Sequence, residues 1–377
     1  MKHCVKLHAS FDEIAALDWD RCLPAQAENW TYYRACEACE ATGPHPRAVS
    51  FSLDGKIVAV GPLFTLHYRL DSPLDGCLRK LTDAIERVSG GMLTLRLLGI
   101  GSPYAERCHL GFDADLGEES RSAALAAMLS AIQVYARDAG ISLVILKDLD
   151  EMQAGSLRPQ LTAMGFARMS SLPLAVLELP SSEVDYLASL GKSRRREIRR
   201  KLKKCSAITM ETVSDVSAIA GDISRLYEST HEHSQSDYGD FEVLPDGFFR
   251  EISRLGPGQI MFKLYRSSGS LIAFNLLFLQ PDRVIDKFIG IDYATPRDCD
   301  LHLLSWMENV RQALQLGIRR LQSGQTAYRR KLELGSRLLP CAVYFRHRSA
   351  LLHLVLSMLS RWLAPDRHDP DLKAAAR

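Results

Sequence analysis

The 377-residue chain lacks any apolar run long enough to form a membrane-spanning helix. A helix that crosses a bilayer needs about 20 consecutive apolar residues, and no stretch of this sequence reaches that length. The first ten residues also lack the apolar centre of a secretory signal. These two absences exclude the common patterns of an integral membrane protein and a secreted one, and we expect a cytoplasmic protein.

Cysteine is present, but its spacing shows neither a disulfide framework nor a metal site. The nine cysteines are scattered along the chain, which is typical of reduced thiols in a reducing compartment. Cys36 and Cys39 form a single CxxC pair. A zinc site needs a second ligand pair at suitable spacing, and none is evident. We therefore expect free thiols and no bound metal.

Aromatic residues are absent from the most highly charged segment, residues 192–204. This segment contains nine Lys or Arg residues and one acid, Glu197, in a chain whose net charge is only +2. Such concentrated positive charge attracts phosphates, carboxylates or an acidic surface, although a solvated helical face fits equally well. Single-stranded nucleic acid would favour aromatic residues among the cations, so we expect no DNA partner.

What the sequence does contain indicates two domains of mixed α and β structure. A chain of this length exceeds one ordinary core. Its content of 46% hydrophobic and 24% charged residues is typical of globular proteins. Segments with strand and helix character alternate along both halves, so we predict an α/β (α+β) fold in which each domain has a mixed central sheet flanked by helices.

The two halves also repeat each other in sequence. Gly55–Phe64 aligns with Gly269–Phe278, and both follow a turn that favours a β-hairpin. Ala136–Ile141 aligns with Ala313–Ile318, where a helix ends at Gly and a strand begins. Hairpins and helix ends resemble each other in many proteins, so chance is an alternative. Two matched segments in the same order favour a duplicated domain joined near Pro180.

We therefore predict three parts: residues 1–180, residues 181–348, and an apolar helix with a tail at 349–377. Residues 350–364 are strongly apolar, with Arg361 and Trp362 near the end. This segment is too short to span a bilayer. Packing on the domain is the favoured interpretation, and contact with a membrane surface is the alternative.

The motifs of the second half resemble those of a known family. They are the basic segment 192–204, the Gly269–Phe278 strand, Ile289–Tyr293, the helix ending at Leu316-Gly317, and Gly324–Gly335. Together they resemble the GNAT acyltransferase superfamily, in its FemAB-like and CelD-like branch. The resemblance is best over residues 183–340. It implies two GNAT-like domains in tandem.

The resemblance also implies an enzyme that transfers an acyl or aminoacyl group to an amine. FemAB-like proteins take the group from aminoacyl-tRNA and place it on a peptidoglycan precursor, whereas other GNAT proteins use acyl-CoA or an acyl-carrier protein. The implied acceptor is an amine on a small molecule, a lipid or a cell-envelope precursor. No cofactor would be bound permanently, because the donor is a co-substrate.

One departure from the family concerns its pyrophosphate loop, which is rich in glycine and leads into a helix N-terminus. The matching segment of the second half, Thr295–Asp300, has no glycine, and that of the first half, Asp113–Glu119, is acidic. A conventional CoA site is therefore doubtful in both halves, and we expect the first half to be degenerate.

The resemblance places the catalytic residues at Tyr328 and Lys331, with Asp292 and Tyr293 at a strand end beside them. Lys331, expected to be exposed, would supply positive charge to phosphate or to the oxyanion. A carboxylate at Asp292 would orient the amine, and the phenol of Tyr293 would protonate the leaving group.

The predicted substrate-binding residues are cationic, polar or aromatic side chains of the second half. They are Arg194, Arg195, Arg199, His231, His233, Tyr238, Gln325 and Arg329. A second class of function stays open: a non-catalytic module whose basic segment binds an anionic ligand or a membrane surface.

Overall fold

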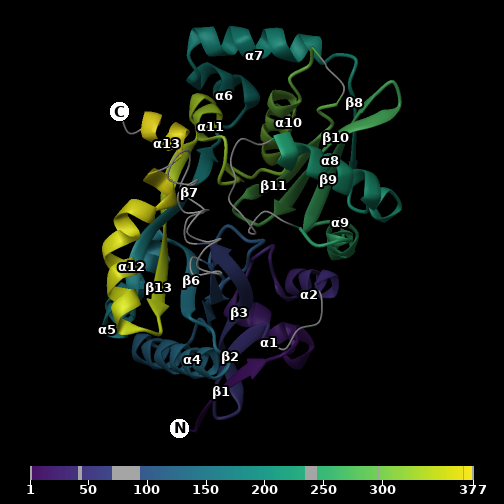
Figure 1. Ribbon diagram of the computed structural model, residues 1–377. Coiled ribbons are helices and arrows are strands. Elements are labelled where there is room, and N and C mark those ends of the chain that lie inside the picture. Colours follow the sequence, from purple (N-terminus) through teal and green to yellow (C-terminus); the bar gives the residue numbers. More distant parts are fainter. Residues whose placement is uncertain are drawn as a thin grey trace.

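The computed structural model describes residues 2–40, 45–69, 94–233, 244–294, 298–367 and 369–375. Within these residues, the strands form one thirteen-stranded mixed sheet against which the helices pack (Figure 1). The same part of the chain contains no helix that is both long and apolar enough to cross a membrane.

The first half begins with a strand and two helices, and a β-hairpin and further strands and helices follow. Its strands are β1 (His3–His8), β2 (Ala48–Leu53), β3 (Lys56–Arg69), β4 (Thr94–Ile100), β5 (Gly111–Phe112), β6 (Leu143–Asp150) and β7 (Ala167–Glu178). Its helices are α1 (Ala16–Cys22), α2 (Trp30–Cys39), α4 (Glu118–Asp138) and α5 (Glu151–Ala163).

The second half opens with two helices and then repeats the pattern. Its strands are β8 (Thr209–Val213), β9 (Ile260–Ser267), β10 (Ser270–Leu279), β11 (Val284–Ile291), β12 (Arg320–Ser323) and β13 (Arg337–His347). Its helices are α6 (Glu183–Ser189), α7 (Lys192–Lys204), α8 (Ala220–His233), α9 (Phe248–Ile252), α10 (Leu301–Gln315), α11 (Tyr328–Glu333), α12 (Ala350–Leu363) and α13 (Pro370–Ala375).

The strand order is symmetric about the middle of the sheet. It runs β1-β2-β3-β4-β6-β13-β7-β12-β11-β10-β9-β8, so each first-half strand on this path has a second-half counterpart at the mirrored place, whereas β5 lies off the path and pairs with β3. The last strands of the two halves are exchanged. β13 pairs with β6, and β7 pairs with β12. Strands from both predicted parts, 1–180 and 181–348, therefore alternate at the middle of the one sheet.

Local sequence explains the repeated turns. The β2–β3 hairpin turns at Asp54 and Gly55, and the β9–β10 hairpin turns at Ser268 and Gly269. All four residues have positive φ angles, between 47° and 86°. This conformation suits the two-residue turns that follow strand twist, and Asp and Gly tolerate it best. The hairpins predicted from the sequence are present.

The crossover helices α4 and α10 also end as their glycines indicate. Gly140 and Gly317 follow these helices with φ angles of 68° and 72°. Each helix connects two parallel strands, β4 with β6 and β11 with β12. Parallel neighbours require such a crossover, so the helix ends set where each parallel pair begins.

A buried hydrogen-bond chain fixes the helices around α11. The Trp306 indole of α10 donates to the Tyr186 hydroxyl of α6 at 3.0 Å, and that hydroxyl donates to the Leu334 carbonyl at 2.8 Å. All three side chains are buried. Because α11 ends next to Leu334, this chain holds α11 against the second-half core.

Two sequence expectations need correction. The cysteines are not all free, because Cys205 after α7 and Cys299 before α10 form a disulfide across 94 residues of sequence. Their spacing could not reveal this pairing, since folding alone brings their Cα atoms to 4.9 Å. The expectation of an exposed Lys331 is also wrong: the side chain is half-buried, and its ammonium donates to the Gly324 carbonyl.

Candidate functional site

The candidate site lies where the parallel strands β11 and β12 separate. They pair only from Val284 to Asp286 and from Leu321 to Ser323. β11 then continues to Ile291, whereas β12 ends and the chain turns at Gly324. Ligand sites in open α/β sheets commonly form at such a divergence, because backbone groups and side chains there have no neighbouring strand.

Three charged side chains meet at this divergence. Lys331 comes from α11, Asp286 from β11, and Glu106 from the first half. A Cβ built on Gly324 would lie 3.4 Å from Glu106 Oε1 and 3.9 Å from Lys331 Nζ, so both groups border this glycine. The Gln322 amide donates to the second oxygen of Glu106 at 3.1 Å.

Asp286 is held from the other side of the opening. The Asn275 amide of β10 donates to Asp286 Oδ1 at 2.6 Å. Asn275 itself is completely buried. The orientation of the Asp286 carboxylate is therefore fixed by a buried amide on the neighbouring strand.

Burial shifts the proton affinity of all three groups. It lowers the pKa of Lys331 to about 8, although attraction to Asp286 and Glu106 opposes the shift. Burial raises the pKa of Asp286 and that of Glu106 above their ordinary values. The physical cause is the same for each, since loss of water disfavours the charged form. Groups with such shifts are candidates for proton transfer near neutral pH.

A second buried network lies beside this site and joins the two halves. Lys287 of β11 donates to Glu28 at 2.5 Å, and His109 lies 3.4 Å from the same carboxylate. The Tyr33 hydroxyl is 2.5 Å from His109 Nδ1. Burial lowers the pKa of His109 to about 4, so the imidazole is neutral at pH 7. Lys287 stays charged because Glu28 and Glu106 outweigh its burial and raise its pKa.

An aromatic and imidazole group lies at the far end of β11. The Tyr293 hydroxyl is 2.5 Å from His302 Nε2, and the ring of His233 stacks on Tyr293 at 4.0 Å. Burial, with help from Arg330, lowers the pKa of His302 to about 4. Burial also raises the pKa of Tyr293.

Comparison with known families now identifies the second half. Residues 192–332 match the model of the acetyltransferase (GNAT) domain. The second half of the chain is therefore similar to a GNAT domain. The match contains β11, β12 and Lys331, and it confirms both the resemblance seen in the sequence motifs and the prediction of an acyltransferase.

Solved structures extend the likeness of fold to the whole chain. FemX superposes with a TM-score of 0.58 at 12% identity, covering 95% of this chain and all of that one. The C-terminal DUF2156 domain of a "Putative Lysylphosphatidylglycerol Synthetase" from Agrobacterium fabrum gives 0.55 at 13% identity, covering 93% and 96%. With the symmetric strand order, these likenesses confirm the predicted tandem GNAT-like fold.

One curated relative is more similar in sequence. It is named "Putative 8-amino-7-oxononanoate synthase 2", from Mycobacterium tuberculosis, and is 26% identical over 291 residues. The alignment covers 73% of this chain but only 36% of that protein. The chain therefore spans about a third of the length of that relative.

The predicted residues in α11 and just before it contact three different parts of the protein. The Tyr328 hydroxyl is buried and donates to the Pro173 carbonyl at 2.9 Å. The Gln325 amide donates to the Leu172 carbonyl at 2.8 Å, and the exposed Arg329 lies against Asp371 of α13. Only Lys331 reaches the charged group at the strand divergence. Tyr328 and Gln325 instead fix the start of α11 against β7.

The predicted cations of α7 divide between inner and outer faces. Arg194 pairs with Glu197 at 2.6 Å and Glu333 at 2.7 Å. Arg195 donates to the carbonyls of Ala188 and Leu190. Arg199, by contrast, is exposed and directed away from the protein. Charge alone could not separate the cations that hold the helix from those that face solvent.

The remaining predicted residues lie near the Tyr293 group or outside the described part. Asp292 accepts from the backbone of Ala294 at 3.0 Å, which shapes the turn after β11. His231 is exposed on α8, which extends to His233. Tyr238 lies outside the described residues, as does part of Thr295–Asp300. No described residues form a cluster of three or more His, Cys, Asp or Glu able to hold a metal.

Sequence reasoning missed the two carboxylates of the site. Asp286 had a signal, because Asp286 and Lys287 interrupt the apolar β11 sequence, where charges need a partner or a function. Glu106 had none. It lies in a loop of the first half, more than 200 residues before Lys331, and only the fold brings it to the GNAT domain.

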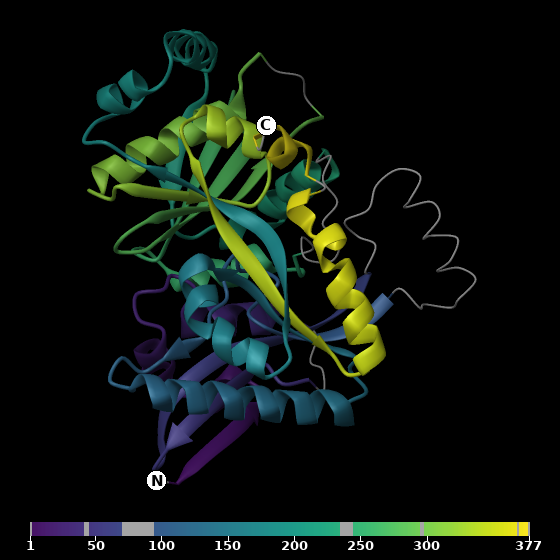
Figure 2. The same ribbon diagram turned by 90° about the vertical axis from the view of Figure 1, so that its left-hand side faces the viewer.

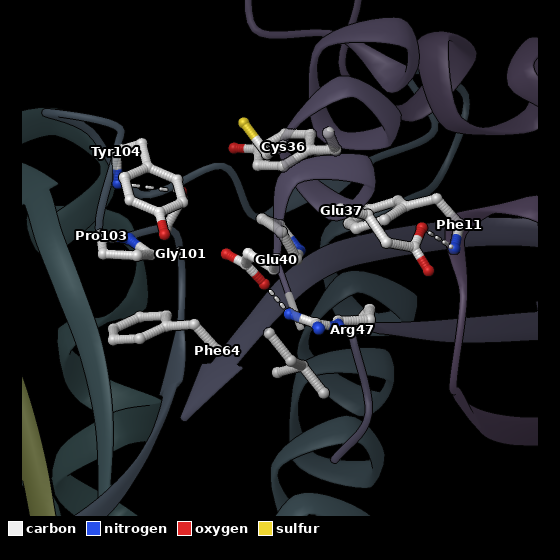
Figure 3. Close-up of a pocket in the computed structure, with 13 residues that line it drawn as sticks. Phe11, Cys36, Glu37, Glu40, Arg47, Phe64, Gly101, Pro103 and Tyr104 are labelled. Carbon is white, nitrogen blue, oxygen red and sulfur yellow. Dashed lines mark hydrogen bonds and ion pairs between the residues drawn. The ribbon is translucent and has the colours of Figure 1, made fainter. Parts of the chain in front are cut away.

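A separate hollow lies in the first half, between α2, the middle of β3 and the loop after β4 (Figure 3). Its cavity volume is about 30 Å³, and it is partly open to solvent. Phe64 and Tyr104 line one wall, while Glu40 and Arg47 point toward each other and form an ion pair. Glu40 and Arg47 therefore neutralise each other, while Glu37, which also lines the hollow, pairs with Arg34.

Proposed function

We propose that this protein transfers an acyl or aminoacyl group to an amine at the opening between β11 and β12. The observation that carries the proposal is the buried ammonium of Lys331, which borders Gly324 together with Glu106, is attracted by Asp286 and Glu106, and has a pKa of about 8. The two carboxylates come from different halves of the chain. The reaction would therefore take place at the junction of the two halves.

The carboxylates provide the proton acceptor that the reaction requires. An amine is protonated at neutral pH and must lose that proton before it can attack a carbonyl. Asp286 and Glu106 have raised pKa values and are partly shielded from water. A carboxylate with a raised pKa is a better general base than a free surface carboxylate. We assign proton removal to this pair.

Lys331 provides the positive charge. Attack of the neutral amine on the donor carbonyl forms a tetrahedral oxyanion, which then collapses to the amide and releases the thiol or hydroxyl of the carrier. An ammonium fixed in a site with little water stabilises the developing charge strongly. The Gly324 carbonyl orients this ammonium through a hydrogen bond. Tyr328 is a positioning residue in this scheme, because its hydroxyl is engaged with Pro173.

We propose an acceptor amine on a cell-envelope or lipid precursor. The support is the shared fold with FemX and with the domain named for a lysylphosphatidylglycerol synthetase. The Tyr293, His302 and His233 group would contact this acceptor or the donor at the outer end of β11. The first half, residues 1–180, would supply Glu106 to this site.

We propose a donor attached to an anionic carrier, either an acyl-carrier protein or aminoacyl-tRNA. Five cations of α7 are exposed and spaced so that they share one face of the helix: Lys192, Arg196, Arg199, Arg200 and Lys203. The ion pairs of α7 involve other cations, Arg194, Lys201 and Lys204. Helix α7 lies at the edge of the molecule (Figure 1), where its exposed cations could attract a large anionic carrier.

The test is a donor panel with the purified protein. Acyl-CoA, acyl-carrier protein and aminoacyl-tRNA are each incubated with protein and amine acceptors, and amide formation is followed by mass spectrometry. We expect turnover with a carrier-bound donor and its loss in Asp286→Asn. If every donor binds in a salt-sensitive way and none is turned over, the proposal of an acyltransferase is contradicted, and a non-catalytic binding module is supported. Turnover that Asp286→Asn leaves unchanged would place the chemistry elsewhere.

A further inference from the structure

Helix α12 packs against the sheet in an unusual orientation. It contacts β7 and β13, and in both views it lies along the outside of the molecule (Figures 1 and 2). The residues that face the protein are mostly small or polar: His353, Ser357 and Ser360, together with Leu356. A surface helix normally turns its apolar side inward, so α12 is inverted.

The side of α12 that faces solvent is almost entirely apolar. Its exposed residues are Leu351, Leu352, Leu354, Val355, Met358, Leu359 and Trp362. Leu351 and Trp362 are 71% and 72% exposed. Scattered apolar residues on a surface are ordinary, but a contiguous patch of this kind marks a contact with a partner or a membrane.

The polar groups on the inward side of α12 form hydrogen bonds in this orientation. The Ser357 hydroxyl donates to the His353 carbonyl at 2.6 Å, and the Ser360 hydroxyl donates to the Ser357 carbonyl at 2.8 Å. The backbone of His347 donates to the His353 ring at 3.4 Å. Rotating the helix to bury its leucines would place these polar groups in water and leave β7 and β13 facing a different surface. The outward leucines are thus a stable feature of the fold.

Charge decides between the two simplest occupants of this face. The exposed cations Arg348 and Arg361 lie at opposite ends of the patch, and residues 350–364 contain no acid. Two copies of α12 packed face to face, in either direction, would bring arginines near arginines. A bilayer with anionic headgroups would meet both cations with opposite charge.

We propose that α12 docks the protein on the surface of an anionic bilayer. The helix has 14 residues, about 21 Å, which is too short to cross the hydrocarbon but suited to lying in the headgroup region. Trp362 has the amphipathic ring that is favoured at this depth. The leucines would enter the acyl boundary while Arg348 and Arg361 contact phosphates.

Docking would also bring the catalytic helix near the membrane. α12 leads into α13, where Asp371 accepts from the Arg329 backbone of α11 at 3.0 Å. This point rests on the proposed function, in which α11 carries Lys331. The acceptor amine would then be presented at the bilayer surface. The basic face of α7 lies apart from α12 in both views, so it stays open to a carrier (Figures 1 and 2).

The test is co-sedimentation of the full chain with vesicles of phosphatidylcholine alone or mixed with phosphatidylglycerol. We expect binding to the anionic vesicles. We also expect Leu354→Ser with Met358→Ser to weaken this binding at least about tenfold, because two apolar side chains no longer leave water. The matched control is Leu17→Ser with Val134→Ser, which removes exposed apolar residues of α1 and α4 and should bind as the unchanged protein does.

Further outcomes bear on the occupant and are independent of catalysis. Arg348→Gln with Arg361→Gln should reduce the preference for anionic vesicles while leaving residual binding. Circular dichroism shows whether each variant stays folded. Absence of vesicle binding by the unchanged protein would overturn the proposal. A second result would also overturn the proposal. In it, analytical ultracentrifugation shows that the unchanged protein is a dimer and that Leu354→Ser with Met358→Ser is a monomer, while vesicle binding is the same for both.

Discussion

The two halves have the same strand order but differ at equivalent openings. In the first half, the loop after β4 closes over its own opening: the Lys147 ammonium of β6 donates to the Ala105 carbonyl at 2.9 Å. The next residue, Glu106, extends across to Gln322 of the second half. In the second half, β11 and β12 separate beside Lys331, and this ammonium donates to the Gly324 carbonyl of its own half.

This difference shows how a duplicated fold can concentrate its chemistry in one copy. The first half keeps the sheet, exchanges β7 for β13, and contributes Glu28, His109 and Glu106 to the junction. The second half provides the strand divergence and the lysine. The family match to residues 192–332 therefore covers only part of the proposed site.

The largest expected effect comes from Lys331→Met. Loss of one charged donor to an oxyanion costs on the order of 10²-fold in rate, and we expect a fall of about that size in kcat. Methionine keeps the length of the side chain, so the fold should persist. Steady-state kinetics and thermal unfolding measure both quantities. The control is Lys56→Met in the first-half hairpin, which should change kcat little. A variant of Lys331 with unchanged kcat would contradict the assigned role.

The next effect tests whether the first half takes part. Glu106→Gln keeps the shape of the side chain and its contact with Gln322, but it removes a proton acceptor beside Lys331. We expect kcat to fall about tenfold with little change in KM, because Asp286 remains. Glu119→Gln, at the exposed start of α4, is the matched control. Equal kinetics for both variants would mean that the second half works alone.

A pH profile sharpens the same comparison. The raised pKa values of Asp286 and Glu106 mean that activity should increase with pH as these groups lose protons. The pKa of Lys331 near 8 means that activity should then fall, by about tenfold at pH 9, as its charge is lost. In Lys331→Arg the charge persists, so the alkaline fall should move to higher pH. A profile whose alkaline limb is the same in both proteins would assign it to another group.

The sequence predicted the repeated architecture well because its signals are local. Asp54-Gly55 and Gly269 specify hairpins, and Gly140 and Gly317 end crossover helices. The strand exchange had no such signal, because the pairing of β13 with β6 joins residues about 200 positions apart. The site followed the same rule. Lys331 was found through its motif, whereas Glu106 depends on contact between the halves.

The basic helix shows a further limit of sequence reasoning. Nine cations in 13 residues gave the charge of the segment but not the direction of any side chain. Arg195 proved to hold two backbone carbonyls, and Arg194 to hold Glu333. A substitution at either position would therefore disturb the packing of α7 as well as its charge, so only the outer cations isolate the charge itself.

The smallest expected effect concerns this outer face of α7, the element that precedes β8 in the second half. Arg196→Gln with Arg199→Gln should raise KM for a carrier-bound donor about threefold, because exposed charges mainly steer association. The variant should also depend less on salt, since fewer charges are left to be screened. Both changes should leave kcat and KM for a small amine acceptor unaltered.

The matched control is Arg225→Gln, an exposed cation of α8. Measurements of KM at low and moderate ionic strength separate the two variants. If Arg196→Gln with Arg199→Gln and the control give the same KM and the same salt dependence, the outer face of α7 is a solvated surface, and the donor approaches the second half from another side.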